Sequence, residues 1–343
     1  MVMGHLLLIV LPIYVAAYSK LGWITLVCWI FFGCAANGIA NLMHECCHYH
    51  VFKRKRGSEI LGRYVVAPLL MADFESYRER HWAHHKCLGV EGETKDAYLI
   101  DIHGKNLFVL LIRSLLMLEM VNKFSKQINF GIAQKEVHKD YHWMRTTLLF
   151  QTMFFATILF AAYLGHPFSR EALIHGSVIY AFVYCYGLTS LTVFMADLRA
   201  IAEHQLDAEQ GAQEGYAALR NFRCNFFERF FFGAYGFGEH YTHHEIPGIP
   251  YYHLKEATED ISCKDNTLKP VIGYLGTLKK LTQYRESIDI NPDESFSSRD
   301  TALGGGRDQK SVSYDVVSAL NKRDHHQRRV SISVKKEAHR RGK

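Results

Sequence analysis

Residues 21–48 read LGWITLVCWIFFGCAANGIANLMHECCH, an apolar run that ends in two histidines. The run contains no Asp, Glu, Lys or Arg before Glu45. Its 23 residues up to Met43 are enough for a helix to cross roughly 30 Å of hydrocarbon at about 1.5 Å per residue. The stretch therefore predicts a transmembrane helix whose end carries His44 and His48.

Three further apolar runs accompany this one. Residues 6–18 precede it, beyond a turn at Ser19-Lys20, and are short for a span. Residues 146–169 and 172–196 contain no Asp, Glu, Lys or Arg and are separated by Arg170 and Glu171. The pattern predicts an all-α integral membrane protein with about four transmembrane helices in two hairpins. A signal peptide is the alternative for residues 6–18, although no Lys or Arg precedes that run.

Composition excludes several other classes of protein. The chain has 343 residues, of which 48% are hydrophobic and 25 are glycine, so it is neither wholly disordered nor collagen-like. Its eight cysteines form no CxxC pair, and this favours free thiols over a secreted disulfide framework. The net charge of +6 is small for this length and suits a membrane surface as well as a nucleic acid. The apolar runs lead us to expect a membrane, and no nucleic acid, as the partner.

Basic residues predict the orientation in the membrane. The two hairpin tips offer only Lys20 and Arg170. Many more basic residues lie near the opposite ends of the spans: Lys53, Arg54, Lys55, Arg56, Arg63, Lys135, Lys139, Arg145 and Arg199. By the positive-inside rule, the middle segment and the C-terminal half are expected to be cytosolic.

Two shorter apolar segments and the C-terminal end are expected to lie outside the spans. Residues 107–121 and 226–237 are too short or too charged to cross, and we expect both at the membrane interface. After about Tyr284 the chain becomes polar and ends in a basic stretch. We expect a membrane domain over residues 1–283 and a disordered basic C-terminal tail over residues 284–343.

Histidine is the anomalous residue, with 20 in the chain. Nine of them recur in tight groups that are all predicted on the cytosolic side. The groups read HECCH, HWAHH, an isolated Glu-His and HYTHH. They contain His44, His48, His81, His84, His85, His204, His240, His243 and His244. Spacings of three and four residues place imidazoles on one face of a helix, where they can share a metal ion.

Nine imidazoles exceed the four positions of one tetrahedral metal site, so the sequence predicts two metal ions with four or five ligands each. All-nitrogen ligands suit Fe, Zn, Cu or Ni, and the ligand type alone does not identify the metal. We expect the remaining histidines not to bind metal. They are His5, His50, His103, His138, His142, His166, His175, His253, His325, His326 and His339.

The order of these groups, with Ile246-Pro247 and Pro250-Tyr251-Tyr252 after the last, resembles the membrane fatty acid desaturase family and its hydroxylase and ketolase relatives. The stretch His84-His85-Lys86-Cys87-Leu88-Gly89, followed by Asp96, is similar to the stretch that follows the second histidine box in that family. The resemblance covers roughly residues 20–283. It implies a helical membrane domain capped by a cytosolic di-iron centre, for which the nine histidines are the ligands and O2 the co-substrate.

The resemblance also implies the reaction and the partners. The expected activity is desaturation of a lipid acyl chain, with electrons from a separate donor of the cytochrome b5 or ferredoxin type. The chain has neither a His-Pro-Gly-Gly haem signature nor an iron–sulfur cysteine spacing. Some relatives have Asn one helical turn before the isolated histidine, where this chain has Ala200. The carboxylates expected to orient ligand imidazoles are Glu45, Asp73, Glu79, Glu203 and Glu239.

Three alternatives stay open from the sequence. A hydroxylase or ketolase of the same family, acting on a lipid or carotenoid, would use the same ligands. His44-Glu45-Cys46-Cys47-His48 also matches HExxH, which suggests a zinc intramembrane protease with Glu45 as general base. A metal transporter would need ionisable residues within the spans, where His175 is the one candidate.

Overall fold

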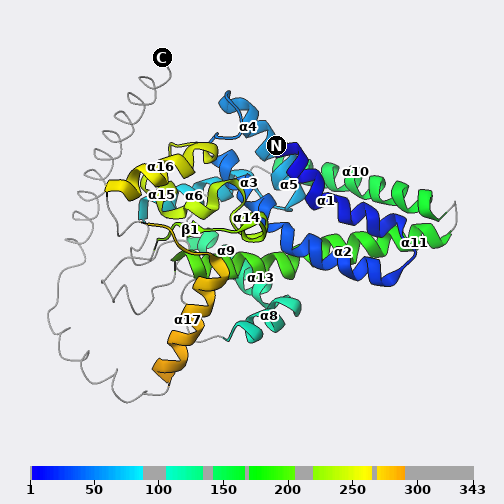
Figure 1. The fold of residues 1–343 in the computed structure, drawn as a ribbon. Helices are drawn as coiled ribbons and strands as arrows, with labels where there is room; N and C mark the ends of the chain where they lie inside the picture. Colours follow the sequence, from blue (N-terminus) through cyan, green and yellow to red (C-terminus); the bar gives the residue numbers. More distant parts are fainter. Residues whose placement is uncertain are drawn as a thin grey trace.

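The computed structural model describes residues 2–87, 106–133, 142–166, 170–204, 219–264 and 269–289. Within these ranges the protein is mostly helical and consists of two parts (Figure 1). We call the apolar part the bundle and the polar part the cap. The bundle comprises α1 (Val2–Tyr18), α2 (Gly22–Ala35), α10 (His142–Gly165), α11 (Arg170–Ile179) and the π-helical η2 (Tyr180–Tyr186).

Both predicted hairpins are present in the bundle. α1 packs against α2, and α10 packs against α11. Three continuous helices are long and apolar enough to cross a membrane: Gly22–Cys47, His142–Gly165 and Arg170–His204. α1 is apolar but only 17 residues long. Three of the four predicted spans thus meet the length requirement, and the fourth is the segment that the sequence already marked as short.

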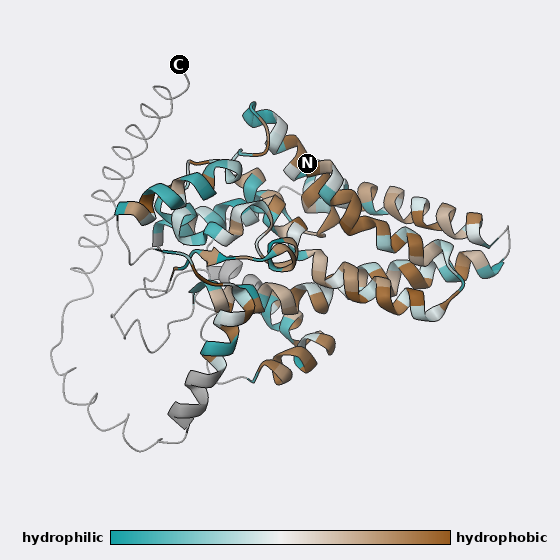
Figure 2. Ribbon diagram, viewed as in Figure 1, coloured by the Kyte–Doolittle hydropathy of each residue, from teal (hydrophilic) through white to brown (hydrophobic). Residues whose placement is uncertain are grey.

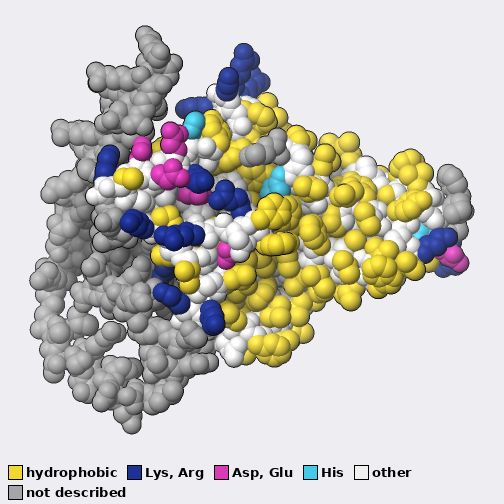
Figure 3. Space-filling view, viewed as in Figure 1, with side chains coloured by type: hydrophobic (Ala, Val, Ile, Leu, Met, Phe, Trp, Pro, Cys, Tyr) yellow, Lys and Arg dark blue, Asp and Glu magenta, His cyan; other side chains and the backbone are white. Residues whose placement is uncertain are grey.

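The bundle buries one apolar face of each helix and exposes another. Ile13, Phe32 and Ile158 are fully buried between the helices, whereas Leu148 is 70% exposed. Hydrophobic side chains predominate on the face of the bundle seen in Figure 3, and charged side chains lie on the cap and at the far tip of the bundle (Figures 2 and 3). An apolar surface of this extent is unfavourable in water. It therefore indicates that the bundle is surrounded by the hydrocarbon of a membrane.

The two hairpin tips lie side by side at the end of the bundle farthest from the cap (Figure 1). A Cβ atom added to Gly165 would come within 2.1 Å of the carbonyl oxygen of Tyr18. Glycine is therefore required at this close approach. Lys20 and Arg170 consequently share one end of the molecule, as the two-hairpin prediction requires.

Helices of the bundle run on into the cap. After a turn at Ala36, α2 continues as α3 (Asn37–Cys47), and η2 continues through α12 (Gly187–Thr189) into α13 (Leu191–His204). Gly33 of α2 lies against Leu191, where an added Cβ would come within 2.6 Å of the leucine Cβ. This close contact brings the two helices together just before each enters the cap.

The rest of the cap is built from short elements. The segment after α3 forms α4 (Lys55–Leu61), the π-helical η1 (Gly62–Val66), α5 (Ala67–Leu69) and α6 (Phe74–Cys87). The C-terminal half adds β1 (Phe222–Arg223), α14 (Phe226–Phe231), the 3-10 helix η3 (Ala234–Glu239), α15 (His240–Glu245), α16 (Tyr251–Lys264), β2 (Val271–Ile272) and α17 (Tyr274–Asp289). β1 and β2 pair in parallel, with Phe222 opposite Val271.

The two segments predicted at the membrane interface are each broken. Residues 107–121 form α8 (Leu107–Leu115) and the start of α9 (Leu118–Ala133), separated at Met117, which has a φ of 57°. Residues 226–237 form α14 and part of η3, where Tyr235 and Gly236 have positive φ. Residues 107–121, expected as one interfacial helix, are thus divided between two helices. Phe108, Phe226 and Phe227 expose 67%, 78% and 70% of their surface, as an interfacial anchor would.

The predicted boundary at residue 283 falls within α17, which continues to Asp289. Residues 290–343 lie outside the described residues. The disordered C-terminal tail therefore stays a prediction.

Candidate metal centre

Four segments bring the nine grouped histidines together in the cap. His44 and His48 lie at the end of α3, and His204 is the last residue of α13. α6 carries His81, His84 and His85, and α15 carries His240, His243 and His244. Eight of the nine are buried, and His85 is half-buried. Side chains more than 150 residues apart in the sequence thus meet in one enclosed place.

Five of the histidines form the first group, which we define as His44, His48, His81, His85 and His243. One nitrogen from each lies within 4.8 Å of the others. The Nε2 atom of His81 is 2.6 Å from that of His48 and 3.0 Å from that of His85. The Nε2 atoms of His85 and His243 are 3.1 Å apart.

The other four form the second group, which we define as His84, His204, His240 and His244. His84, His204 and His244 place ligand atoms within 4.8 Å of one another, and so do His204, His240 and Glu203. The Nε2 atoms of His204 and His240 are 3.0 Å apart. The two groups adjoin, because the rings of His85 and His244 have centroids 4.4 Å apart.

Helix geometry explains how the histidines divide. Successive residues of an α-helix point about 100° apart, whereas residues four apart point in nearly the same direction. His81 and His85 accordingly share the first group, while His84 faces the second. α15 has the same spacing with the groups exchanged. His240 and His244, four residues apart, face the second group, and His243 faces the first. An HxxHH motif therefore contributes to two sites at once.

Burial lowers the pKa of two histidines in the second group. The pKa values of His240 and His244 lie well below the ordinary histidine value, first because burial removes water from the charged form and then because neighbouring histidines repel it. A neutral imidazole offers a lone pair to a metal ion, whereas a protonated one cannot. His240 and His244 can therefore offer their lone pairs to a metal cation.

The spacing of the nitrogens fits metal ligation. Two imidazole nitrogens at about 2.1 Å from one ion, at right angles to each other, are about 3.0 Å apart. The measured separations of 2.6 to 3.1 Å are close to this value. Imidazole nitrogens are ligands for iron, zinc, copper or nickel. Each group can therefore hold one metal ion.

The family model for fatty acid desaturases matches residues 21–265, which is more than two thirds of the chain. The chain belongs to the fatty acid desaturase family. It is accordingly an integral membrane protein of a di-iron oxidoreductase family. The matched range contains all nine histidines.

Family membership sets aside the zinc protease, and the position of Glu45 agrees. Its Oε1 atom is 2.9 Å from Nδ1 of His44, and its Oε2 atom is 3.6 Å from Nδ1 of His50. A general base needs a carboxylate that can reach a water molecule, but this one is 1% exposed and held between two imidazoles. In the desaturase-family chain Glu45 instead fixes the orientation of the His44 ring.

The other predicted carboxylates divide by position. Glu203 lies beside the second group, with its Oε2 atom 3.7 Å from Nε2 of His240. Asp73 immediately precedes α6, and its Oδ1 accepts a hydrogen bond from the Glu75 backbone at 3.1 Å. Glu79 is exposed. Burial raises the pKa of Glu239, and the positive charges of Arg229 and Lys255 partly offset this rise. Only Glu45 and Glu203 lie beside grouped histidines in the contacts described.

The histidines predicted not to bind metal lie elsewhere or at the margin. His50 stacks on His48 with ring centroids 5.4 Å apart but belongs to neither group. His5 contacts the Tyr235 hydroxyl at 2.9 Å, and His175 contacts the Ala16 carbonyl at 3.1 Å inside the bundle. His142, His166 and His253 also lie outside the groups. Outside the described residues lie His103, His138, His325, His326 and His339.

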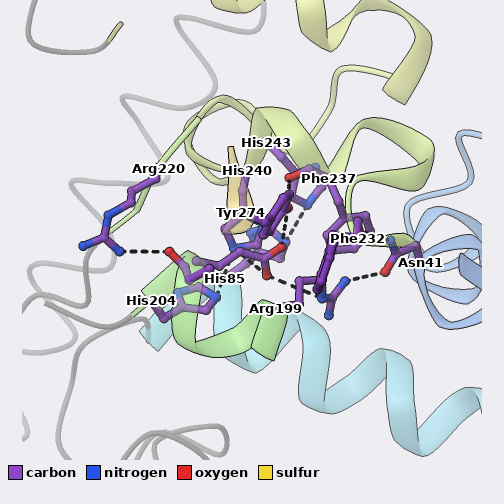
Figure 4. Close-up of polar contacts among 12 residues, drawn as sticks. Asn41, His85, Arg199, His204, Arg220, Phe232, Phe237, His240, His243 and Tyr274 are labelled. Carbon is purple, nitrogen blue, oxygen red and sulfur yellow. Dashed lines mark hydrogen bonds and ion pairs between the residues drawn. The ribbon is translucent and has the colours of Figure 1, made fainter. Parts of the chain in front are cut away.

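Sequence reasoning missed a buried polar network behind the second group. Arg199 donates to Asn41 Oδ1 and lies 4.3 Å from the centroid of the Phe237 ring (Figure 4). The Tyr274 hydroxyl contacts Glu203 Oε1 at 2.9 Å and the Phe237 carbonyl at 2.8 Å. These residues are separated by up to 233 positions in the chain, so no local spacing could have revealed them.

A second network holds α15 in position. Asn221 donates to Thr242 Oγ1 at 3.0 Å and accepts from the Thr242 backbone at 3.1 Å. Arg220 donates to the Ala202 carbonyl of α13 at 3.0 Å (Figure 4). The segment before β1 thus joins α13 to α15, the two helices that supply three members of the second group.

Proposed function

We propose that this protein is a membrane fatty acid desaturase that introduces a double bond into a lipid acyl chain, with O2 as co-substrate and two iron ions bound by the nine grouped histidines. The observation that carries the proposal is the division of the histidines into two adjoining buried groups at the end of an apolar bundle. Two iron ions held there would supply the redox chemistry that removes hydrogen from an unactivated C–H bond. Zinc has no redox chemistry and would not serve.

The protein's own residues supply the environment. The members of the first group are mostly buried beneath aromatic side chains: the His44 ring lies 4.5 Å from that of Phe237, and His81 stacks on Tyr77. Such packing keeps water away from a reactive oxidant. Met43 and the apolar helix before it lead from the bundle directly to His44. We propose that the lipid chain approaches the centre from this apolar end of the bundle.

The cap and the C-terminal tail are proposed to face the cytosol. Support comes from charge: Lys20 and Arg170 are the basic residues of the hairpin tips, whereas Lys53, Arg54 and Arg199 belong to the other end of the spans. Basic residues near span ends favour the cytosolic side. Accessibility labelling of cysteines introduced at Lys20, Arg170 and Arg54 tests this orientation. The first two should react only from outside, and a tip that reacts from inside would contradict it.

A separate protein of the cytochrome b5 or ferredoxin type is proposed to supply the electrons. The support is the sequence, in which no haem signature or iron–sulfur cysteine spacing occurs. Adding each type of reduced donor to the purified protein, and measuring product formation, identifies the one that it accepts.

The decisive experiment is expression in a host that lacks the activity, followed by mass spectrometry of the lipids. A desaturase yields acyl chains that have lost two hydrogens, whereas a hydroxylase or ketolase yields chains with an added oxygen. His84→Ala serves as the inactive control for either product. Failure to alter any lipid, in a protein that carries iron and receives electrons, would contradict an acyl-chain substrate.

A further inference from the structure

Glu203 lies beside the second histidine group. It is 1% exposed and precedes His204 on α13. Its carboxylate and the imidazoles of His204 and His240 place their ligand atoms within 4.8 Å of one another. Among the described residues, no other carboxylate shares such a group with the nine histidines.

Contacts behind the carboxylate determine which way it points. Oε1 lies 2.9 Å from the Tyr274 hydroxyl, whose single hydrogen is shared between this oxygen and the Phe237 carbonyl, 2.8 Å away. Oε2 lies 3.7 Å from both Arg199 Nε and His240 Nε2. One oxygen is thus anchored by the protein, and the other faces the nitrogen that His240 directs toward His204.

Tyr274 makes this anchor rigid. Its ring is fully buried. It stacks against Phe222, with ring centroids 4.1 Å apart, and against Phe232, with ring centroids 5.2 Å apart. A side chain packed on two sides has little freedom to move its hydroxyl. The carboxylate of Glu203 is therefore held in a fixed orientation.

Glu45 shows what a merely orienting carboxylate looks like here. It contacts Nδ1 of His44, so it acts on the ring from the side that leaves Nε2 available. Glu203 instead faces Nε2 of His240, the same atom that lies 3.0 Å from Nε2 of His204. The two carboxylates thus occupy different sides of their imidazoles.

We infer that Glu203 is itself a ligand of the second metal ion, which then has four histidines and one carboxylate where the first ion has five histidines. The inference rests on the proposed di-iron function. One turn before His204, the chain has Ala200, whose methyl group cannot bind metal or water. Mixed imidazole and carboxylate ligands are typical of non-haem iron sites. A bound cation, together with Arg199, also offsets the cost of burying the carboxylate.

Metal binding by the full chain purified in detergent tests the inference. Ferrous ion is added without oxygen, and bound iron is counted per chain for the wild type, Glu203→Gln and Glu256→Gln. We expect about two ions in the wild type and Glu256→Gln. In Glu203→Gln the second ion should bind at least about 10- to 100-fold more weakly. Glu256→Gln is the matched control, because it removes the same charge at an exposed site on α16, outside both groups.

A spectroscopic measurement adds a readout that is independent of affinity. The Mössbauer spectrum of the iron-loaded wild type should contain two unequal components, one for each ligand set. Glu203→Gln should change only one of them, and Tyr274→Phe should shift the same component while both ions stay bound. Tyr274→Phe retains the stacked ring, so it reports on the carboxylate even if Glu203→Gln does not fold.

Two negative results have different meanings. If Glu203→Gln binds two ions as tightly as the wild type, with both spectral components unchanged, the carboxylate is not a ligand and the inference is overturned. If the wild type itself does not bind two iron ions, the proposed di-iron function is what fails. Unchanged components in Tyr274→Phe would likewise contradict the anchoring described above.

Discussion

The bundle and the cap bury different kinds of side chain. In the bundle, helices pack through apolar residues such as Ile9, Ile13 and Phe32. In the cap, the buried set includes eight histidines, Glu45, Glu203 and Asn41. Apolar packing tolerates exchange between residues of similar volume, but a buried polar group is costly unless its partner is present. Substitutions in the cap should therefore be the more severe.

The largest effect is expected from loss of one grouped histidine. His81→Ala and His244→Ala remove a ligand from the first and second group, respectively, and each should abolish lipid oxidation. Both proteins should still insert, because the bundle supplies the apolar surface that the membrane requires. Product analysis and membrane fractionation of the two variants measure these outcomes. His253→Ala, at an exposed site on α16, is the matched control. Full activity in either ligand variant would contradict the expectation that substitutions in the cap are more severe than those in the bundle.

Acid should weaken the metal-free cap next. His240 and His244 have lowered pKa values when folded, so below about pH 6.5 the unfolded chain binds more protons than the folded one. Each such histidine should therefore destabilise the fold progressively as the pH falls below that value, and should have no such effect above it. Thermal unfolding of metal-free protein at pH 7.5 and pH 5 measures the loss. An unfolding midpoint that does not fall between these pH values would contradict it.

A smaller effect is expected at the junction between the two parts. Asn41 is fully buried on α3, donates to the carbonyl of Phe232 at 2.9 Å and to that of Ala234 at 3.2 Å, and accepts from Arg199. Asn41→Leu should lower the free energy of unfolding by about 1 to 3 kcal/mol, because it leaves these buried partners without a hydrogen bond. Thermal unfolding in detergent measures the cost. Asn37→Leu, which loses one contact to Phe231 at 3.1 Å, should be milder. Equal costs would show that Arg199 does not depend on Asn41.

The smallest effect is expected from removal of the C-terminal tail. Truncation after Asp289 should leave metal content and activity nearly unchanged, because the removed residues are too polar to add a core of their own. Iron counting and product analysis of the shortened chain test this. Loss of iron would show that His325, His326 or His339 takes part in the centre after all.

The sequence predicts the two parts by different signals, and each has its own limit. Uncharged runs locate the hairpins because hydrocarbon excludes charge over a fixed length. Histidine spacing identifies the nine grouped residues. The division into two groups follows from helix geometry, since His84 and His85 are adjacent and must point apart. Which ring meets which across α3, α6, α13 and α15 depends on tertiary packing, which local spacing does not encode.

Breaks within helices are also invisible to hydropathy. Residues 107–121 are mostly apolar, yet Met117 has a positive φ of 57°, and the helix is interrupted there. The role of Tyr274 is hidden for another reason. Nothing in its neighbourhood sets it apart from the 18 other tyrosines. Its function depends on Phe222, Phe232 and Glu203, which other parts of the chain supply.

The parallel pairing of β1 with β2 bears on where this protein can be divided. The residues matched to the family end at 265, before β2 and α17 begin. Gly273 lies so close to Glu228 that an added Cβ would come within 2.1 Å of Oε2, and the Leu275 backbone donates to Oε1 at 3.0 Å. A chain that stopped at 265 would retain every grouped histidine. It would lose the contacts of Gly273 and Leu275 with Glu228, and also the Tyr274 hydroxyl. Homology limits are therefore a poor guide to the shortest active fragment, and protein engineering should preserve residues through α17.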